Sequence, residues 1–144
     1  MATEGRLLSL VYISAATRLF SEDDLKALLE QSRKKNKRLG ITGMLLYKDG
    51  NFMQVLEGSN ETVTGLYRTI ERDPRHHGVW ELIRQQLEAR EFPAWSMGFR
   101  NLKDVDLQQM PGYSTFLNRP LTSTDFQADP TRAQKLLRMF REKM

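Results

Sequence analysis

The sequence predicts an α+β fold with a ferredoxin-like sheet, and three observations lead to this prediction. A buried strand opens the chain at residues 7–14, the dipeptide Asp49-Gly50 marks a hairpin within residues 40–58, and two amphipathic helical stripes flank that hairpin. If a later segment forms another strand, the element order becomes βαββαβ with one further strand. The first and third strands would then lie side by side in the middle of a mixed sheet, with both helices on one face.

The first two elements have clear local signals. The segment LLSLVYIS, residues 7–14, is apolar and β-branched enough for a buried strand. Ser21 then precedes three acidic residues, which is typical of a capped helix start, and leucines follow at helical spacing. We therefore expect a helix over residues 22–37.

The later elements differ in how clearly the sequence predicts them. A second helix is expected over residues 60–72, capped by Ser59 or Asn60, because its apolar residues form one stripe. The pattern of residues 79–92 fits a helix or a strand. Residues 94–102 alternate as a strand does.

The end of the chain differs in composition from the rest. The stretch PGYSTFLNRPLTSTDFQADP, residues 111–130, is rich in turn formers, and residues 130–144 predict a helix with Pro130 at its first position and one apolar stripe. We expect residues 1–102 to form the ligand-binding domain and residues 103–144 a C-terminal helical extension that carries the output.

Composition limits the classes of function. The 144 residues include 22 Lys and Arg against 18 Asp and Glu, for a net charge of +4, and no cysteine. The absence of cysteine excludes disulfides and thiolate zinc sites. No segment resembles a signal peptide or a membrane span, so we expect a cytoplasmic protein without membrane contact. The basic run RKKNKR is expected to be a helix C-terminus rather than a nucleic-acid site, because no aromatic residues lie among its charges.

Four polar residues fall on faces that should point into the domain. Period two places Gln54 between two apolar residues on the inward face of its strand, and Tyr12 falls on the inward face of the first strand. The inward stripe of the first helix becomes polar at Ser32 and Asn36. Unpaired, a buried carboxamide costs about 1–3 kcal/mol, so Gln54 must have partners.

Two interpretations of these residues remain. Tyr12 and Gln54 could simply satisfy each other as buried polar groups do. Four convergent polar residues beneath two apolar helical stripes instead indicate a slot for a flat, mostly apolar ligand with hydrogen-bonding edges. Leu28 and Ile70 belong to the stripes that would form its walls.

Evidence for an enzyme is weak. His76 and His77 are adjacent in what reads as a polar turn, which favours exposure over catalysis. No glycine-rich phosphate loop and no set of metal ligands is present, and the acids at residues 22–24 are explained by the helix start. The residues alone therefore indicate a small-ligand-binding domain. A ferredoxin-like regulatory module for another metabolite or for RNA is the alternative.

Several short motifs occur together in a distinctive order. LVYIS surrounds Tyr12, GITGMLLY follows Asn36, FMQVLEG surrounds Gln54, and RDPRHH and WSMGF come after the second helix. Over residues 6–102 the chain resembles the BLUF family, flavin-binding domains that sense blue light. This resemblance implies the ferredoxin-like fold and a strand at residues 79–92.

The resemblance also implies a cofactor site. The ring of FAD, or of FMN or riboflavin, would lie between the two helices, with Asn36 on its pyrimidine edge and Gln54 bridging the ring and Tyr12. Other expected cofactor contacts are Leu28, Ser32, Ile70, Asp73 and His76, and Trp95 and Met97 match the pair that relays the signal. Lys35 and Thr69 depart from relatives that carry asparagine and arginine there, so the expectation for phosphate binding falls on neighbouring lysines.

The implied mechanism is photochemical rather than enzymatic. Blue light would make the flavin an oxidant, Tyr12 would give an electron and a proton, and the Gln54 amide would end in another orientation or tautomer, which reddens the absorption. We expect no catalytic domain, because residues 103–144 are too few for one. A homo-oligomer and an unidentified downstream protein are the expected partners.

Overall fold

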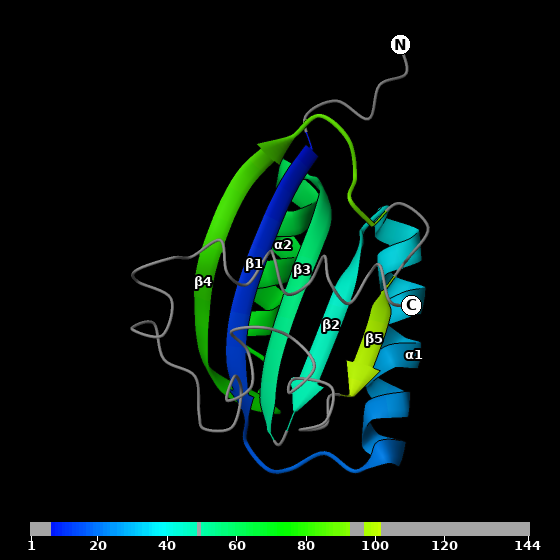
Figure 1. Ribbon diagram of the computed structural model, residues 1–144, viewed down its shortest axis with the longest axis vertical. Helices are drawn as coiled ribbons and strands as arrows, with labels where there is room; N and C mark the ends of the chain where they lie inside the picture. The colour runs from blue at the N-terminus through cyan, green and yellow to red at the C-terminus, as the bar shows by residue number, and fades with distance from the viewer. Residues whose placement is uncertain (1–6, 49, 93–96, 102–144) are drawn as a thin grey trace, which may run out of the picture.

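The computed structural model describes residues 7–48, 50–92 and 97–101 (Figure 1). Its elements, in chain order, are β1 (Leu7–Ala16), α1 (Glu22–Leu39), β2 (Thr42–Lys48), β3 (Asn51–Ser59), α2 (Asn60–Glu71), β4 (His76–Leu87) and β5 (Gly98–Asn101). The predicted order βαββαβ with one further strand is therefore confirmed.

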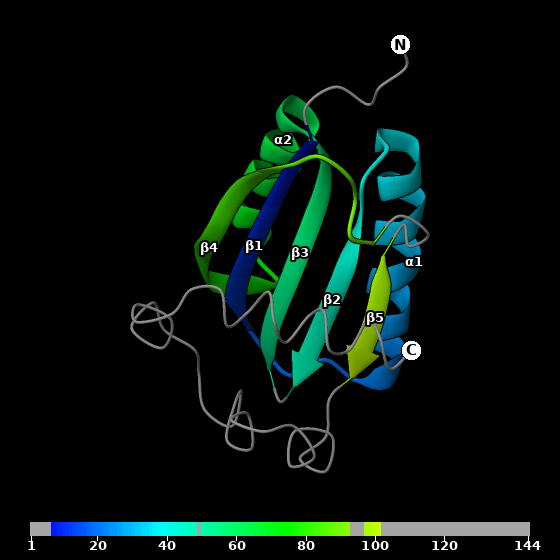
Figure 2. The ribbon, with the colours of Figure 1, turned by 45° about the horizontal axis from the view of Figure 1, so that its top comes forward.

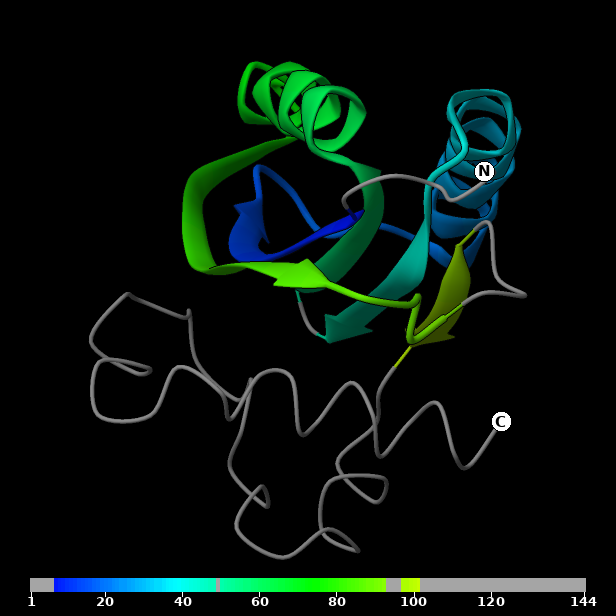
Figure 3. The same cartoon turned by 90° about the horizontal axis from the view of Figure 1, so that it is seen from above.

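The five strands form one sheet in the order β4-β1-β3-β2-β5. β1 and β3 are antiparallel neighbours in its middle, and β5 adds to β2 in the parallel sense. Both helices lie on the same face of the sheet, which Figure 2 shows obliquely and Figure 3 shows from above. This is the ferredoxin-like α+β arrangement that the sequence predicts.

The helix starts follow the predicted chemistry. The Ser21 hydroxyl accepts the Asp24 backbone N–H, and the Asp24 carboxylate accepts the Ser21 N–H, each at 3.0 Å, so the cap is reciprocal. Ser59 caps α2 by accepting the N–H of Thr62 at 3.2 Å. Each hydroxyl satisfies a donor that the first turn of a helix leaves unpaired.

The bounds of several elements differ from the sequence prediction, most clearly for α1 and β4. α1 continues to Leu39, and Gly40 ends it in the left-handed region at φ +70°. β4 starts at His76 and ends at Leu87, earlier at both ends than the expected 79–92. The reason is the long antiparallel ladder with β1, whose last pair is Ala16 with His76. The two histidines therefore begin a strand, and the prediction of a polar turn there is wrong.

The main core lies between the sheet and the two helices. Buried members of this layer include Leu10 and Leu56 from the central strands, Leu25 from α1 and Val63 from α2. The inward stripes of both helices therefore pack as the 3.6-residue period predicts. β3 is buried on both of its faces, since Met53 and Val55 are also at most 2% exposed.

Some expectations concern residues outside the described ranges. Asp49 of the hairpin turn is one, although its neighbour Gly50 has the positive φ of +88° that such a turn requires. The helix expected at residues 130–144 and the extension over 103–144 also lie outside these ranges. Neither helix of the described part has the length and apolarity needed to cross a bilayer.

Candidate functional site

The centre of the candidate site is a buried pair on the two middle strands. Tyr12 and Gln54 are direct cross-strand partners in the β1–β3 ladder, so their side chains emerge on the same face, toward the helices. The Tyr12 hydroxyl donates a hydrogen bond to Gln54 Oε1. They are 4% and 6% exposed, respectively. Their adjacency was expected from the sequence and is present in the fold.

Gln54 has a second partner at the entry to β5. Its Nε2 donates to the thioether sulfur of Met97 at 3.2 Å, and Met97 is 2% exposed. The two contacts together use one acceptor and one donor of the amide. A carboxamide has two N–H groups and two acceptor lone pairs, so Gln54 retains capacity for a ligand.

The C-terminal half of α1 supplies another amide to this layer. Asn36 is 2% exposed, and Ser32, one turn earlier, is half-buried. Both continue the inward stripe of Leu25 and Leu29, which explains why polar side chains face the sheet there. The predicted change of this stripe from apolar to polar is confirmed.

The turn after α2 contributes a polar rim. His76 Nε2 lies 2.5 Å from the carbonyl oxygen of Ile70, and its Nδ1 lies 2.8 Å from the Ser14 hydroxyl. Since a carbonyl only accepts, Nε2 carries a proton in this arrangement. The Asp73 carboxylate accepts a hydrogen bond from the Arg75 guanidinium, and this pairing lowers the pKa of the Asp73 carboxyl. Arg75 also reaches Gln31 on α1 at 3.4 Å.

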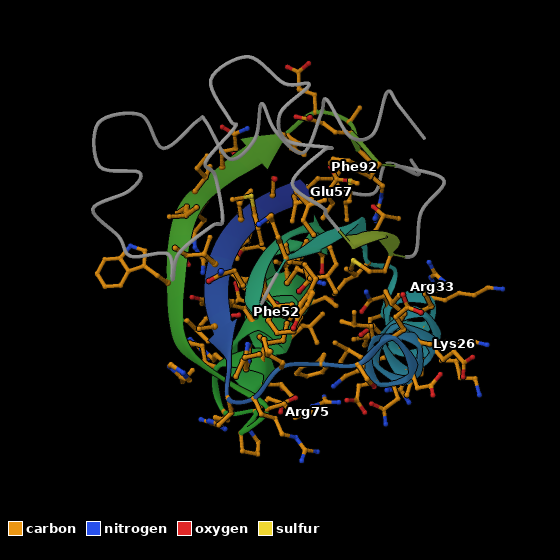
Figure 4. All side chains as sticks on the ribbon, turned by 60° about the horizontal axis from the view of Figure 1, so that its bottom comes forward. Lys26, Arg33, Phe52, Glu57, Arg75 and Phe92 are labelled. Atoms are coloured by element: carbon orange, nitrogen blue, oxygen red, sulfur yellow. The ribbon has the colours of Figure 1, made fainter. Side chains whose placement is uncertain are left out.

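These groups surround one cavity of about 400 Å³ between the sheet and the helices. Residues from every element except β5 and from the adjoining turns line it: Tyr12, Phe20, Leu28, Gln31, Ser32, Lys35, Asn36, Leu45, Phe52, Gln54, Leu66, Thr69, Ile70, Asp73, Arg75 and His76. Figure 4 labels two of these residues, Phe52 on β3 and Arg75 in the turn after α2.

Burial controls the electrostatics of the cavity floor. Desolvation raises the pKa of the Tyr12 phenol far above its usual value, and the nearby Tyr67 adds to this effect. Burial also raises the pKa of Tyr67 to about 12. The two rings are 5.6 Å apart and tilted by 56°. Tyr12 is therefore a neutral phenol that donates its proton to a hydrogen bond, rather than a phenolate.

The cavity suits a flat heteroaromatic ring. Its volume falls within the usual range of about 300–1,000 Å³ for small-molecule sites. Its lining includes aromatic and aliphatic side chains such as Phe20, Leu28 and Ile70, together with the side-chain amides of Asn36 and Gln54, which carry donors and acceptors. This donor and acceptor set fits the carbonyl and imide edge of a flavin.

All eight residues expected to contact the cofactor line this cavity. That they bind a flavin stays a prediction. Of the four residues expected in the photochemistry, Tyr12, Gln54 and Met97 form a continuous hydrogen-bonded chain. Trp95 lies outside the described residues.

Two neighbouring features had no prediction from the sequence. Glu57 is fully buried and accepts hydrogen bonds from Thr42 at 3.0 Å and from the backbone N–H groups of Glu91 and Phe92 at 2.7 and 2.9 Å. Arg33 Nε donates to the Met97 carbonyl oxygen at 3.0 Å. A carboxylate in a strand that is otherwise mostly apolar was the available signal for the burial of Glu57, and the contact of Arg33 had no signal in the sequence.

A protein-family model for the sensors of blue light using FAD, abbreviated BLUF, matches residues 7–98. The photoactivated adenylate cyclase subunit beta of Euglena longa is 40% identical over 95 residues, which cover 65% of this chain and 11% of that protein. The blue light- and temperature-regulated antirepressor of Escherichia coli strain K12 is 33% identical over 79 residues, which cover 55% of this chain and 20% of that protein. The chain thus spans a small fraction of the length of these relatives.

A solved structure has a similar fold. The dark-state structure of the BLUF protein BlrB superposes with a TM-score of 0.78 at 28% identity, and the match covers 99% of this chain and 100% of that one. The family model, the sequence relatives and the similar solved structure therefore all point to the same family of light sensors.

Proposed function

The chain belongs to the BLUF family of blue-light sensors that use a flavin, and we propose that it is a short photoreceptor whose output begins with a rearrangement of the Gln54 amide. The observation that supports this is the hydrogen-bonded chain from Tyr12 through Gln54 to Met97, at the edge of a cavity of flavin-ring size. A bound flavin supplies a blue-light-excited state that accepts an electron.

Tyr12 has the properties of the electron and proton donor. Its phenol is buried and neutral, and it already donates a hydrogen bond to Gln54 Oε1. Loss of an electron makes a phenol strongly acidic, so its proton has a ready acceptor on the amide oxygen. Gln54 is thereby the group that carries the proton and turns or tautomerises when the proton returns.

Met97 gives the two orientations of the amide different energies. A thioether sulfur accepts hydrogen bonds and has no proton to donate. With Nε2 toward Met97, as in this structure, both amide ends are satisfied by protein groups. A reversed amide would place Oε1 against the sulfur and lose that hydrogen bond. The segment that carries Met97 is therefore where a change at Gln54 first reaches the backbone.

A second cavity is the proposed place for the phosphate-bearing tail of FAD or FMN. It has about 890 Å³ and shares Phe20, Leu28, Gln31 and Arg75 with the first cavity. Arg18 and Lys34 add cationic side chains to its lining, beside Asp24 and Glu30. We expect FAD to bind more tightly than riboflavin, and high salt to reduce that difference because it screens exposed charges. Equal affinities would contradict the tail site and leave the ring site standing.

The output is proposed to be protein contact rather than catalysis. The Euglena relative is named a photoactivated cyclase, but this chain spans 11% of it, and the shared part corresponds to the sensor. We propose that residues 103–144 carry the change to a second copy or to an unidentified protein partner in the cytoplasm. Deletion of residues 126–144 should keep the light-induced spectral shift and abolish light-dependent changes in self-association or partner binding.

Absorption spectroscopy tests the central proposal. The purified protein should retain a non-covalent oxidised flavin and show a small red shift under blue light that reverses in the dark. A colourless protein that also fails to take up added FAD, FMN or riboflavin would contradict it. It would then favour a ferredoxin-like module for another ligand.

A further inference from the structure

Met97 is held from two sides by two elements. Its side-chain sulfur accepts the Gln54 amide at 3.2 Å, on the sheet side. Its backbone carbonyl accepts Arg33 Nε at 3.0 Å, from helix α1. The residue that contacts the photochemical amide is thus also tied to a helix whose outer side faces solvent.

The connection from β4 to β5 has another attachment near its start. The Glu57 carboxylate accepts the backbone N–H groups of Glu91 and Phe92, and Figure 4 shows Phe92 beside Glu57. Phe92 is 3% exposed. Multiple hydrogen bonds to a buried charged acceptor hold a backbone strongly.

The attachment of the Met97 backbone to α1 is weaker than this. It consists of one hydrogen bond from the guanidinium of an exposed residue, where water competes for the donor. β5 also has few pairs to hold it, since its ladder with β2 contains four residue pairs. Of the two ends, the one at Met97 therefore responds more readily to a change in its contacts.

We propose that Arg33 is a positioning residue that holds Met97 against Gln54 and so stabilises the amide orientation in which Nε2 faces the sulfur. The inference rests on the proposed function, since it concerns the same amide. Arg33 is not among the residues that line the cavity, and its guanidinium reaches the backbone of Met97, through which it would act. The surface of α1 is by this route coupled to the photochemical pair.

The proposal predicts a change in the rate at which the protein returns from the light state to the dark state. The return restores the hydrogen bond from Gln54 to Met97, and Arg33 keeps the sulfur in place for it. Without Arg33, the arrangement to which the amide returns is less stabilised. Recovery in the dark should therefore slow by about two- to tenfold, the range of one net hydrogen bond.

The experiment compares Arg33→Ala with Lys26→Ala in the flavin-loaded, full-length protein. Lys26 lies seven residues earlier on α1, two turns away on the same side, and Figure 4 shows both residues on that helix. Dark recovery is measured by absorption, and the Met97 methyl resonance is recorded in the dark. Arg33→Ala should slow recovery and shift or broaden the methyl signal, whereas Lys26→Ala should change neither. Arg33→Lys, which keeps a charged donor, should restore part of the wild-type rate.

A double variant separates positioning from general stability. In a Met97→Leu background there is no sulfur to position, so Arg33→Ala should have no further effect on recovery. An unchanged or faster recovery in Arg33→Ala would overturn the proposal, as would an unaltered methyl signal or equal effects in the two backgrounds. A normal red shift in the wild-type protein alongside any of these results would leave the photoreceptor function intact and reject only the role of Arg33.

Discussion

Two of the buried polar side chains on strand β3, Gln54 and Glu57, lie three residues apart on opposite faces. Gln54 faces the helices and contacts two side chains, the phenol of Tyr12 and the thioether of Met97. Glu57 faces the other way and accepts one hydroxyl and two backbone N–H groups. Both connect β3 to the segment between β4 and β5, yet their chemistry gives them different roles.

The difference lies in what each side chain can exchange. An amide has a donor end and an acceptor end of nearly equal shape, so rotation changes its hydrogen bonds with little change in packing. A carboxylate has only acceptors, and donors that converge on it favour one arrangement. Gln54 is therefore suited to switching and Glu57 to holding. Buried polar groups on one strand can thus have opposite dynamic roles.

The largest expected effect comes from removing the switch. Tyr12→Phe deletes the phenolic donor and keeps the ring volume, so the flavin should still bind while the light-induced red shift disappears. Gln54→Leu should do the same, because no amide remains to rearrange. Light-minus-dark absorption spectra of the flavin-loaded variants provide the measurement. A normal photocycle in either variant would assign the switch to other residues.

The next largest effect tests the holding role of Glu57. Glu57→Gln replaces one acceptor oxygen by an NH₂ group that faces a backbone donor, which should reduce the free energy of unfolding by about 1–3 kcal/mol. Urea unfolding measures this loss, and the exposed Glu88→Gln serves as the control. The red shift should persist, since the Tyr12–Gln54 pair is untouched. Its loss would mean that the two groups are not functionally separate.

A smaller effect is expected at the other buried amide of the cavity. Asn36 is proposed to bind the ring edge without switching, so Asn36→Ala should weaken flavin binding by about two- to tenfold, or roughly 0.5–1.5 kcal/mol, and keep a red shift. Titration of the apoprotein with FAD measures this, with the exposed Arg38→Ala as the control. Unchanged affinity would place Asn36 away from the ring.

The smallest effect is a pH dependence that separates the two groups further. Burial raises the pKa of the Glu57 carboxyl, against the opposing hydrogen bonds from Glu91, Phe92 and Thr42. The folded protein then binds this proton more tightly than the unfolded chain, so the free energy of unfolding falls as pH rises from about 4.3 through the folded pKa. The Gln54 amide does not titrate, so it adds nothing to the pH dependence of the free energy of unfolding.

The pH dependence that Glu57 contributes is isolated by subtracting the free energy of unfolding of Glu57→Gln from that of the wild-type protein at each pH. The comparison is needed because Asp73 acts in the opposite direction, with a pKa lowered by Arg75, and loses its stabilisation as pH falls. Urea unfolding between pH 4 and pH 7 should give a difference that decreases with rising pH. A difference that increases would mean that the hydrogen bonds outweigh burial at Glu57.

The features that could be predicted from the sequence are those with local causes. The cap at Ser21, the turn at Gly50 and the helical stripes follow from contacts within a few residues. The two-residue period of a strand likewise places Gln54 on the inward face, whichever residues are its partners. The ferredoxin-like order of strands and helices followed from these signals together with the BLUF motifs.

Contacts between residues far apart in the sequence depend on the tertiary structure. β4 gave an ambiguous pattern because it is an edge strand with mostly exposed side chains, and its ladder with β1 settles its extent. The hydrogen bonds that Met97 makes with Gln54 and Arg33 span 43 and 64 residues. No local pattern encodes such pairs, because strand register and helix docking bring them together only when the whole sheet forms.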